Sequence, residues 1–155
     1  MSLKEVDELE FLPHQHLRSR MKIIEVAAGL VFRDGKLLIT QRPADGHLAG
    51  FWEFPGGKRE PDESFEQALH RELMEELGIE VEVRELVESV IHSYPDRTVR
   101  IEFFLCLWKR HEPQALGCPA FRWVSRHALT GHQFPAADAR LLNKLATDET
   151  FWGQL

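Results

Sequence analysis

The sequence has only two cysteines and no hydrophobic run of membrane-spanning length. Cys106 and Cys118 fit neither a zinc-binding spacing nor a disulfide framework, so we expect two free thiols in a reducing compartment. The first residues are polar and acidic, unlike a signal peptide. We therefore expect a cytoplasmic protein that does not associate with a membrane.

An excess of basic residues is also missing, because 19 Lys and Arg stand against 25 Asp and Glu, for a net charge of −6. A non-specific nucleic-acid binder needs a basic face to meet phosphates, so we expect no nucleic-acid polymer as a partner. Any phosphate that the protein handles would instead arrive with a metal ion. The chain does have 155 residues, 43% hydrophobic content, 4 Trp and 10 Phe, which suffices for one domain with a proper core.

Residues 1–21 are predicted to be a flexible N-terminal extension, with Leu3, Val6 and Leu9 at the spacing of a short amphipathic helix. Residues 22–155 are predicted to form the folded domain. Its strand-like segments cover 23–32, 36–41, 80–91, 99–108 and 121–124, and the leucines of 137–146 indicate a final helix. Strands that interleave with helices predict an α/β protein with a mixed sheet between helices.

One further helix is predicted between these strands, over about 64–77. Ser64 followed by Gln67 is a capping-box pattern, and Gly78 is a typical helix stop. At roughly 100° per residue, three glutamates fall within one sector that adjoins and partly overlaps the apolar stripe of the helix. The glutamates are Glu72, Glu75 and Glu76, and the stripe is Phe65, Leu69 and Leu73.

Acidic side chains crowded on one face repel one another, and burial near the core adds a desolvation cost unless a cation neutralises them. A hard divalent metal explains the cluster, and Mg²⁺ fits best, because it takes one or two carboxylates and completes its shell with water and substrate phosphates. Mn²⁺ is the alternative. The helix alone is equally compatible with a simple solvent-exposed acidic face.

The spacing of the whole stretch decides in favour of the metal. Gly57, five residues, Glu63, seven residues and then Arg71-Glu72-Leu73-Met74-Glu75-Glu76-Leu77-Gly78-Ile79 reproduces in full the signature of the Nudix hydrolase family, which this chain resembles. The resemblance implies the Nudix fold, an α/β/α sandwich with a mixed β-sheet. It also implies a divalent cation on the helix and hydrolysis of a nucleoside diphosphate linked to a further group.

The resemblance also implies roles for individual residues. The metal ligands would be the Gly56 carbonyl and the three glutamates of the helix, and Glu72 or Glu75 would also serve as base. Arg71 would steer the neighbouring glutamates by ion pairing without touching the substrate. Gly57 and Glu63 would be accessory, although Glu63 is as readily explained by a structural hydrogen bond that holds the loop to the helix.

Shorter motifs outside this stretch are similar to MutT-type nucleoside triphosphate pyrophosphohydrolases and their CTP-preferring relatives, from residue 22 to about 145. They are Thr40-Gln41-Arg42-Pro43-Ala44-Asp45, Trp52-Glu53-Phe54-Pro55-Gly56-Gly57-Lys58, Tyr94-Pro95-Asp96-Arg97 and Phe134-Pro135-Ala136-Ala137-Asp138. The resemblance implies substrate contacts from Arg42, Phe54, Tyr94 and Asp138. Each residue has a simpler alternative. Arg42 could be an exposed strand-end cation and Phe54 a core residue, while Tyr94 could be a packed turn aromatic and Asp138 a helix N-cap.

Two positions depart from the family pattern. Asp138 stands where MutT-type enzymes carry Asn, and an ionised Asp only accepts hydrogen bonds, which suits an exocyclic amino group such as that of cytosine. Gly117 stands where some members supply a loop glutamate, and the nearest acid is Glu112. The base would then come from the helix itself, and we expect His111, His127 and His132 to be surface residues.

The leading prediction is therefore a Mg²⁺-dependent pyrophosphohydrolase, a monomer or homodimer, that acts on small nucleoside triphosphates, including oxidised or modified ones. Two alternatives remain open at this point. One is a hydrolase of nucleoside diphosphate sugars or dinucleotide coenzymes. The other is a non-catalytic nucleotide-sensing domain, which would not require the complete set of acids.

Overall fold

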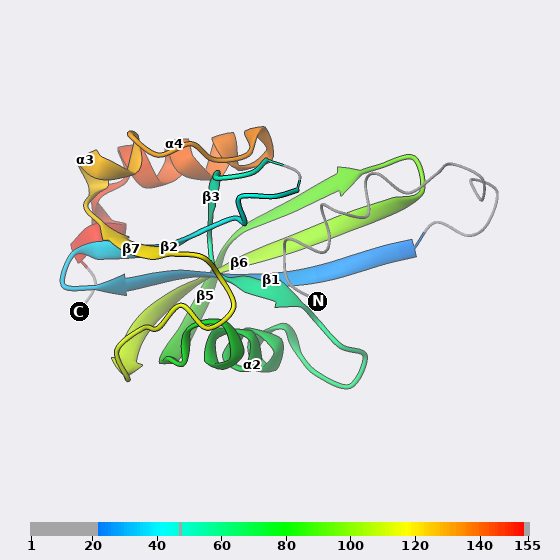
Figure 1. Cartoon of the computed structure of the whole chain (residues 1–155), viewed down its shortest axis with the longest axis horizontal. Coiled ribbons are helices and arrows are strands. Elements are labelled where there is room, and N and C mark those ends of the chain that lie inside the picture. Colours follow the sequence, from blue (N-terminus) through cyan, green and yellow to red (C-terminus); the bar gives the residue numbers. More distant parts are fainter. Residues whose placement is uncertain (1–21, 47, 154–155) are drawn as a thin grey trace.

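The computed structural model describes residues 22–46 and 48–153 of the chain. The predicted extension over 1–21 lies outside these residues. The described part forms one mixed seven-stranded sheet with helices on both faces (Figure 1), as the sequence predicts. None of its helices combines the length and the apolar character needed to span a membrane.

The sheet is organised around one long strand near its centre. Its strands are β1 (Lys22–Arg33), β2 (Lys36–Gln41), β3 (Trp52–Glu53), β4 (Gly56–Lys58), β5 (Glu80–Ser93), β6 (Arg97–Arg110) and β7 (Phe121–Val124). The order is β3-β2-β1-β6-β5, with β4 paired to β1 and β7 paired to β2. Strands β1 and β6 run parallel, whereas the other pairs are antiparallel. Strands β5 and β6 extend beyond the predicted segments because their ladder continues to the hairpin turn.

Helix α2 (Phe65–Leu77) covers one face of the sheet. The opposite face carries α3 (Arg126–Leu129) and α4 (Ala139–Thr147), with the short 3-10 turns η3 (Ala136–Asp138) and η4 (Glu149–Gly153) beside α4 in the chain. The predicted final helix over 137–146 is thus confirmed from residue 139 onward, while its first two residues belong to the 3-10 turn.

Strand β1 supplies both halves of the core, because successive side chains of a strand point to opposite faces. Leu30 and Phe32 pack on the α4 side, together with Leu141 and Leu145. Val31 packs on the α2 side, and so do Ala27, Leu69, Leu73 and Leu77. The nearly uninterrupted apolar run in the sequence is therefore the run of a strand buried on both faces.

Helix α2 has the ends that the sequence predicts. The Ser64 hydroxyl accepts a hydrogen bond from the Gln67 backbone N–H at 3.1 Å, and the Gln67 side chain accepts one from the Ser64 N–H at 2.8 Å. At the other end Gly78 adopts a left-handed conformation with φ of 69°, and its N–H donates to the Met74 carbonyl. These caps determine where the helix that carries the glutamates begins and ends.

Candidate active site

Two glycines of β4, Gly56 and Gly57, allow very close contacts with the backbone of β1 and with the side chain of Glu72. A Cβ on Gly56, whose φ is 156°, would lie 2.0 Å from the Ala27 carbonyl oxygen. A Cβ on Gly57 would lie 2.3 Å from the carboxyl carbon of Glu72. Glycine is therefore required at both positions, and the missing side chain of Gly57 is the space in which the Glu72 carboxylate lies.

The three glutamates of α2 do not share one environment. Glu72 and Glu76 are buried, with 5% and 6% of their surface exposed. The side chain of Glu75 is 60% exposed. The prediction that the helix holds all three carboxylates against the core is wrong for Glu75, because this residue lies at the outer border of the sector.

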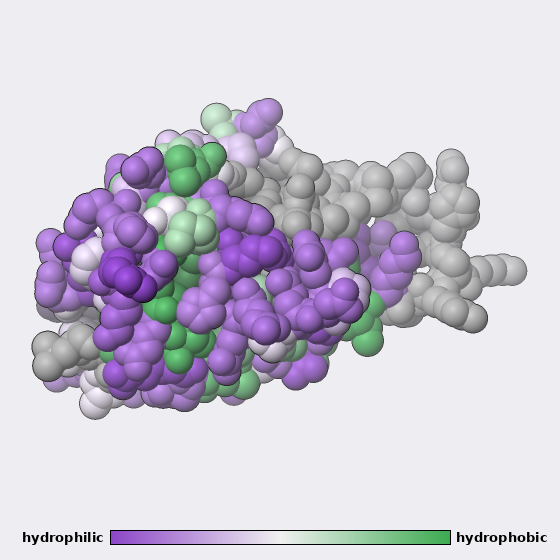
Figure 2. Space-filling model, turned by 90° about the horizontal axis from the view of Figure 1, so that it is seen from below, coloured by the Kyte–Doolittle hydropathy of each residue, from purple (hydrophilic) through white to green (hydrophobic). Residues whose placement is uncertain are grey.

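Seen from the α2 side, the surface is largely hydrophilic with a narrow hydrophobic strip (Figure 2).

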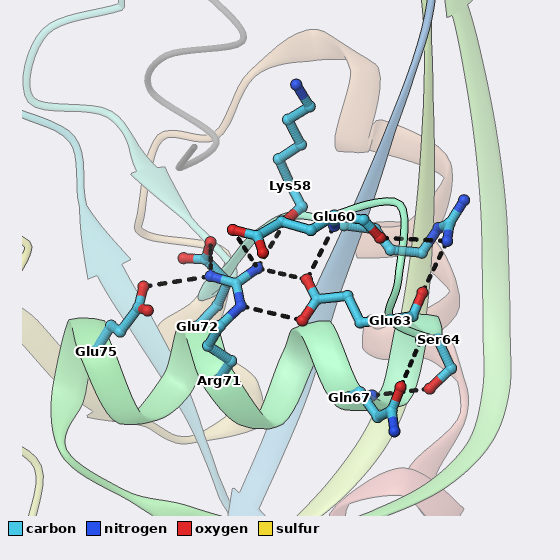
Figure 3. Close-up of polar contacts among 9 residues, drawn as sticks. Lys58, Glu60, Glu63, Ser64, Gln67, Arg71, Glu72 and Glu75 are labelled. Carbon is cyan, nitrogen blue, oxygen red and sulfur yellow. Dashed lines mark hydrogen bonds and ion pairs between the residues drawn. The ribbon is translucent and has the colours of Figure 1, made fainter.

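Arg71 connects the loop before α2 with the glutamates on it (Figure 3). Its Nε and Nη2 donate to the two carboxylate oxygens of Glu63, at 3.1 and 2.6 Å. Its Nη1 lies 3.0 Å from a Glu72 oxygen and 3.3 Å from a Glu75 oxygen. The Nη2 group also donates to the Lys58 carbonyl of β4 at 3.0 Å. Arg71 thus ion-pairs with the neighbouring glutamates, as predicted.

The same contacts shift the acid–base properties of the site. Hydrogen bonds from Arg71 lower the pKa of Glu63, because they stabilise its ionised form. Burial raises the pKa of Glu72, and the hydrogen bond from Arg71 opposes this rise only in part. The hydrogen bond to Glu63 raises the pKa of Arg71, so the guanidinium stays charged. A second cation beside Glu72 would therefore be stabilising.

Glu63 makes the structural contacts that the sequence offered as one of its two readings. Besides the Arg71 pair, it accepts a hydrogen bond from the Glu60 N–H at 2.9 Å. The Glu63 carbonyl accepts another from Arg59 at 2.7 Å. The loop over residues 59–63 is thereby tied to the helix and to β4. An accessory role in catalysis stays a prediction.

The donor set of the site fits a hard divalent cation. Glu72 and Glu76 are both buried and lie one helical turn apart, and the Glu72 carboxylate lies beside Gly57 of β4. Among the described residues, no three His, Cys, Asp or Glu side chains converge on a ready-made metal centre. Such a site suits Mg²⁺, which commonly takes one or two carboxylates and draws its remaining ligands from water and substrate phosphates.

Arg42 lies at the end of β2, where the chain enters the loop that leads to β3. It is 3% exposed, and its NH1 lies 3.1 Å from the Glu53 carboxylate, which is buried as well. The alternative of an exposed strand-end cation is therefore wrong. Sequence reasoning missed Glu53 as its partner, although an acid between the aromatic residues Trp52 and Phe54 was a signal that something buried pairs with it.

An aromatic group occupies the opposite face of the sheet. Phe54 is 1% exposed, stacks on Phe134 with ring centroids 5.1 Å apart, and meets Phe103 edge to face at 6.0 Å. Phe54 is therefore a core residue in this structure. Asp138 is 9% exposed and occupies the N-cap position of α4. Its side chain makes no capping hydrogen bond, so the N-cap explanation of this residue is wrong in that respect.

Tyr94 lies in the turn between β5 and β6, where it packs. Its N–H donates to the Arg97 carbonyl at 2.7 Å, and the Arg97 guanidinium lies over its ring at 4.8 Å. The His92 ring lies 4.5 Å away. The packed turn aromatic is thus what the structure contains, and a contact with the nucleoside stays a prediction.

The loop that supplies a glutamate in some family members carries no acid near α2 in this chain. The N–H groups of Leu116 and Gly117 donate to the Glu76 carbonyl, at 3.1 and 3.0 Å. Glu112 lies elsewhere, in an ion pair with Arg33 at 2.9 Å. A base supplied by the helix stays a prediction.

The fold and this geometry can be compared with known proteins. The chain is 45% identical over 127 residues to the CTP pyrophosphohydrolase of Escherichia coli (strain K12), covering 79% of this chain and 90% of that protein. It is 45% identical over 98 residues to the 8-oxo-dGTP diphosphatase of Proteus vulgaris, covering 62% of this chain and 88% of that protein.

The solution structure of the E. coli ORF135 protein superposes with a TM-score of 0.70 at 43% identity, over 79% of this chain and 88% of that one. A MutT structure from work on Aliivibrio salmonicida and Vibrio cholerae gives a TM-score of 0.69 at 30% identity, over 81% and 97%.

The match extends beyond the motif on α2. Residues 27–144, from β1 to α4, match the NUDIX domain as a whole. Both faces of the sheet, the glycine-lined carboxylate and the aromatic group lie within that range. The chain belongs to the NUDIX domain family.

Proposed function

We propose that this protein is a Mg²⁺-dependent nucleoside triphosphate pyrophosphohydrolase that works in the cytoplasm on oxidised or modified nucleotides. Its products would be a nucleoside monophosphate and pyrophosphate. The observation that carries the proposal is the Glu72 carboxylate, which is buried in the space left by Gly57, paired with Arg71 and one helical turn from buried Glu76. The relatives named for CTP and 8-oxo-dGTP hydrolysis support the substrate class.

The chemistry follows from the charge of the substrate. A water molecule attacks one of the two phosphorus atoms that flank the oxygen bridging the α- and β-phosphates. The new P–O bond forms as the bond from that phosphorus to the bridging oxygen breaks, the leaving phosphate group keeps the electrons of the broken bond, and the proton of the water passes to a base. A divalent cation bound at this site would supply electrostatic stabilisation of the phosphate oxygens. Glu72 and Glu76 would hold it, while Arg71 orients the Glu72 carboxylate. Glu75 is exposed and shares the Arg71 guanidinium with Glu72, and in this proposal it accepts the proton of the water.

Base preference would depend on the other face of the sheet. Asp138 is a buried acid at the start of α4, and it follows closely in the chain after Phe134, which stacks on Phe54. An ionised Asp accepts hydrogen bonds without donating any. It would therefore favour a base edge that presents an amino group, as cytosine does, over one that needs both a donor and an acceptor.

The test is pyrophosphate release, with Mg²⁺ and with EDTA, across a panel of substrates. The panel contains 8-oxo-dGTP, dGTP, CTP, dCTP, modified pyrimidine triphosphates, ADP-ribose and GDP-mannose. We expect Mg²⁺-dependent release of pyrophosphate from triphosphates, with a cytosine nucleotide or 8-oxo-dGTP as the best substrate. Cleavage of only the two diphosphate compounds, without pyrophosphate, would mean that the proposed substrate class is wrong.

A further inference from the structure

His132, expected at the surface from the sequence, is half-buried and engaged at both ring nitrogens. Its Nδ1 lies 2.7 Å from the Ala128 carbonyl oxygen, one turn back in the chain. Its Nε2 lies 3.1 Å from NH1 of Arg122, which comes from strand β7. The imidazole therefore links the loop over residues 130–135 to the sheet and to α3.

These two contacts select between the two tautomers of the neutral ring. A carbonyl oxygen only accepts hydrogen bonds, so Nδ1 must carry the proton. A guanidinium only donates, so Nε2 must present its lone pair to Arg122. The neutral Nδ1–H tautomer satisfies both contacts, whereas the other neutral tautomer satisfies neither. His132 is thus held in one tautomer by its surroundings.

Trp52 completes the cluster from strand β3. The Arg122 guanidinium lies over the Trp52 indole at 4.8 Å, and the His132 ring meets that indole edge to face at 5.3 Å. The backbone N–H of Trp52 donates to the Gln133 carbonyl at 2.7 Å, which is the residue after His132. We name Trp52, Arg122 and His132 together the His132 latch.

The His132 latch lies between the two segments that the proposed function uses. After it in the chain come Phe134, stacked on Phe54, and Asp138 at the start of α4. On the other side, Trp52 precedes Glu53, the ion-pair partner of Arg42, and β4 with its two glycines. The latch thus joins the segment 134–138 to the segment 52–57 at a point close in sequence to both.

We propose that the His132 latch positions the base-reading segment 134–138 relative to the phosphate end of the site, and so determines how tightly the nucleobase is bound. His132 and Arg122 are positioning residues in this scheme, since they act through Phe134 and Asp138 on the substrate. The inference rests on the proposed function, because it assumes that a nucleoside triphosphate is bound there.

Three variants test the latch kinetically. His132→Ala removes both hydrogen bonds, Arg122→Ala removes the partner of Nε2, and His132→Gln retains an acceptor near the Nε2 position. We expect His132→Ala and Arg122→Ala to raise KM for the preferred triphosphate by about threefold to tenfold, the effect of one or two lost hydrogen bonds, with little change in kcat. His132→Gln should recover part of the loss. The matched control is His127→Ala, an exposed histidine on α3 whose ring belongs to no part of the latch.

A substrate without a base separates positioning from general damage. Ribose 5-triphosphate presents the same phosphates and no nucleobase, so its KM should be unchanged in all four variants. A rise in its KM equal to that for the nucleotide would overturn the proposal, because the latch would then act on the site as a whole. Unchanged KM for the nucleotide in His132→Ala and Arg122→Ala would overturn it as well, while leaving the proposed function intact.

A spectroscopic measurement examines the latch independently of turnover. The nitrogen chemical shifts of His132 at mildly alkaline pH should show the Nδ1–H tautomer in the wild type. The Trp52 amide, which donates to Gln133, should exchange faster with solvent in His132→Ala. The opposite tautomer would overturn the latch itself. If the wild type releases pyrophosphate from no triphosphate, the proposed function fails and the positioning role fails with it, whatever the tautomer.

Discussion

The two faces of the sheet do different work with different kinds of side chain. On the α2 face, Arg71 holds a group of carboxylates whose hydrogen bonds and ion pairs surround the Glu72 position. On the α4 face, Phe54 stacks on Phe134 and meets Phe103 edge to face, and the buried acid Asp138 lies at the start of α4. The segment 52–58 serves both faces, since Phe54 packs on one and Gly57 on the other. The carboxylate group and the aromatic group are thus on opposite faces of the sheet but connected by seven consecutive residues.

The strongest way to break this division is to neutralise one of the two buried acids on the α2 face. Glu76→Gln should lower the rate of pyrophosphate release by about a hundredfold or more, because a charged ligand of the proposed cation is lost and with it the stabilisation of the phosphate oxygens. The fold should persist, with an unchanged melting temperature within a few degrees. Glu75→Gln should have a comparable effect on kcat if the exposed carboxylate accepts the proton. Full activity in both variants would contradict the assignment of the helix as the metal-binding element.

Filling the space beside Glu72 should have the next largest effect. Gly57→Ala places a Cβ where the Glu72 carboxylate lies, so the carboxylate must move, at a cost of about 1–3 kcal/mol in unfolding free energy. Activity should fall more steeply than stability, since the displaced group belongs to the site. Gly153→Ala is the matched control, because a Cβ there meets nothing within 4 Å. Assays of turnover and chemical denaturation on both variants make the comparison.

On the α4 face, the next substitution tests recognition of the nucleobase. Asp138→Asn retains the shape of the side chain and adds a hydrogen-bond donor. We expect the ranking of triphosphates by kcat/KM to shift towards 8-oxo-dGTP by about tenfold, while the rate on a shared good substrate changes little. An unchanged ranking would show that Asp138 does not contact the base.

The smallest effect should come from Glu63, whose contacts on the α2 face are structural. Glu63→Gln weakens the pair with Arg71 and should cost about 1 kcal/mol of stability at neutral pH, because both groups are partly exposed. The pKa of Glu63 is lowered in the folded protein, so its contribution is present above the unfolded pKa of about 4.3 and is lost as the pH falls through the folded pKa. The difference in unfolding free energy between wild type and variant should therefore shrink in acid. A constant difference down to the acid limit would contradict this origin.

Features that depend on neighbours in sequence could be predicted well. The caps of α2 involve Ser64, Gln67 and Gly78, which interact within the helix itself, and the Arg71 pairs span at most one or two turns. The motif on this helix also indicated the family and the fold. The sequence pattern and the local geometry agree there, so the sequence alone was sufficient to predict these features of α2.

Features that depend on distant packing were predicted less well. Arg42 meets Glu53 only because β2 and β3 pair, and the sequence alone left it either a substrate contact or an exposed strand-end cation. His132 gains its partner Arg122 from β7, and no residue near His132 in the chain indicates this pairing. Glu75 lay at the border of the predicted sector, where a helical projection cannot tell burial from exposure. In each case the missing information was which strand or loop lies across from the residue.

The parallel pairing of β1 with β6 has a consequence for how the chain reaches this structure. The two strands are joined residue by residue from Lys22 with Arg97 to Phe32 with Leu107, so the centre of the sheet cannot form before residues 97–107 have been synthesised. Helix α2 and its glutamates leave the ribosome earlier, with only part of the surface that they will cover. Contacts of such long sequence separation slow folding, because the loop between them must close before they stabilise anything. The charged face is thus complete in sequence before the sheet that supports it can form.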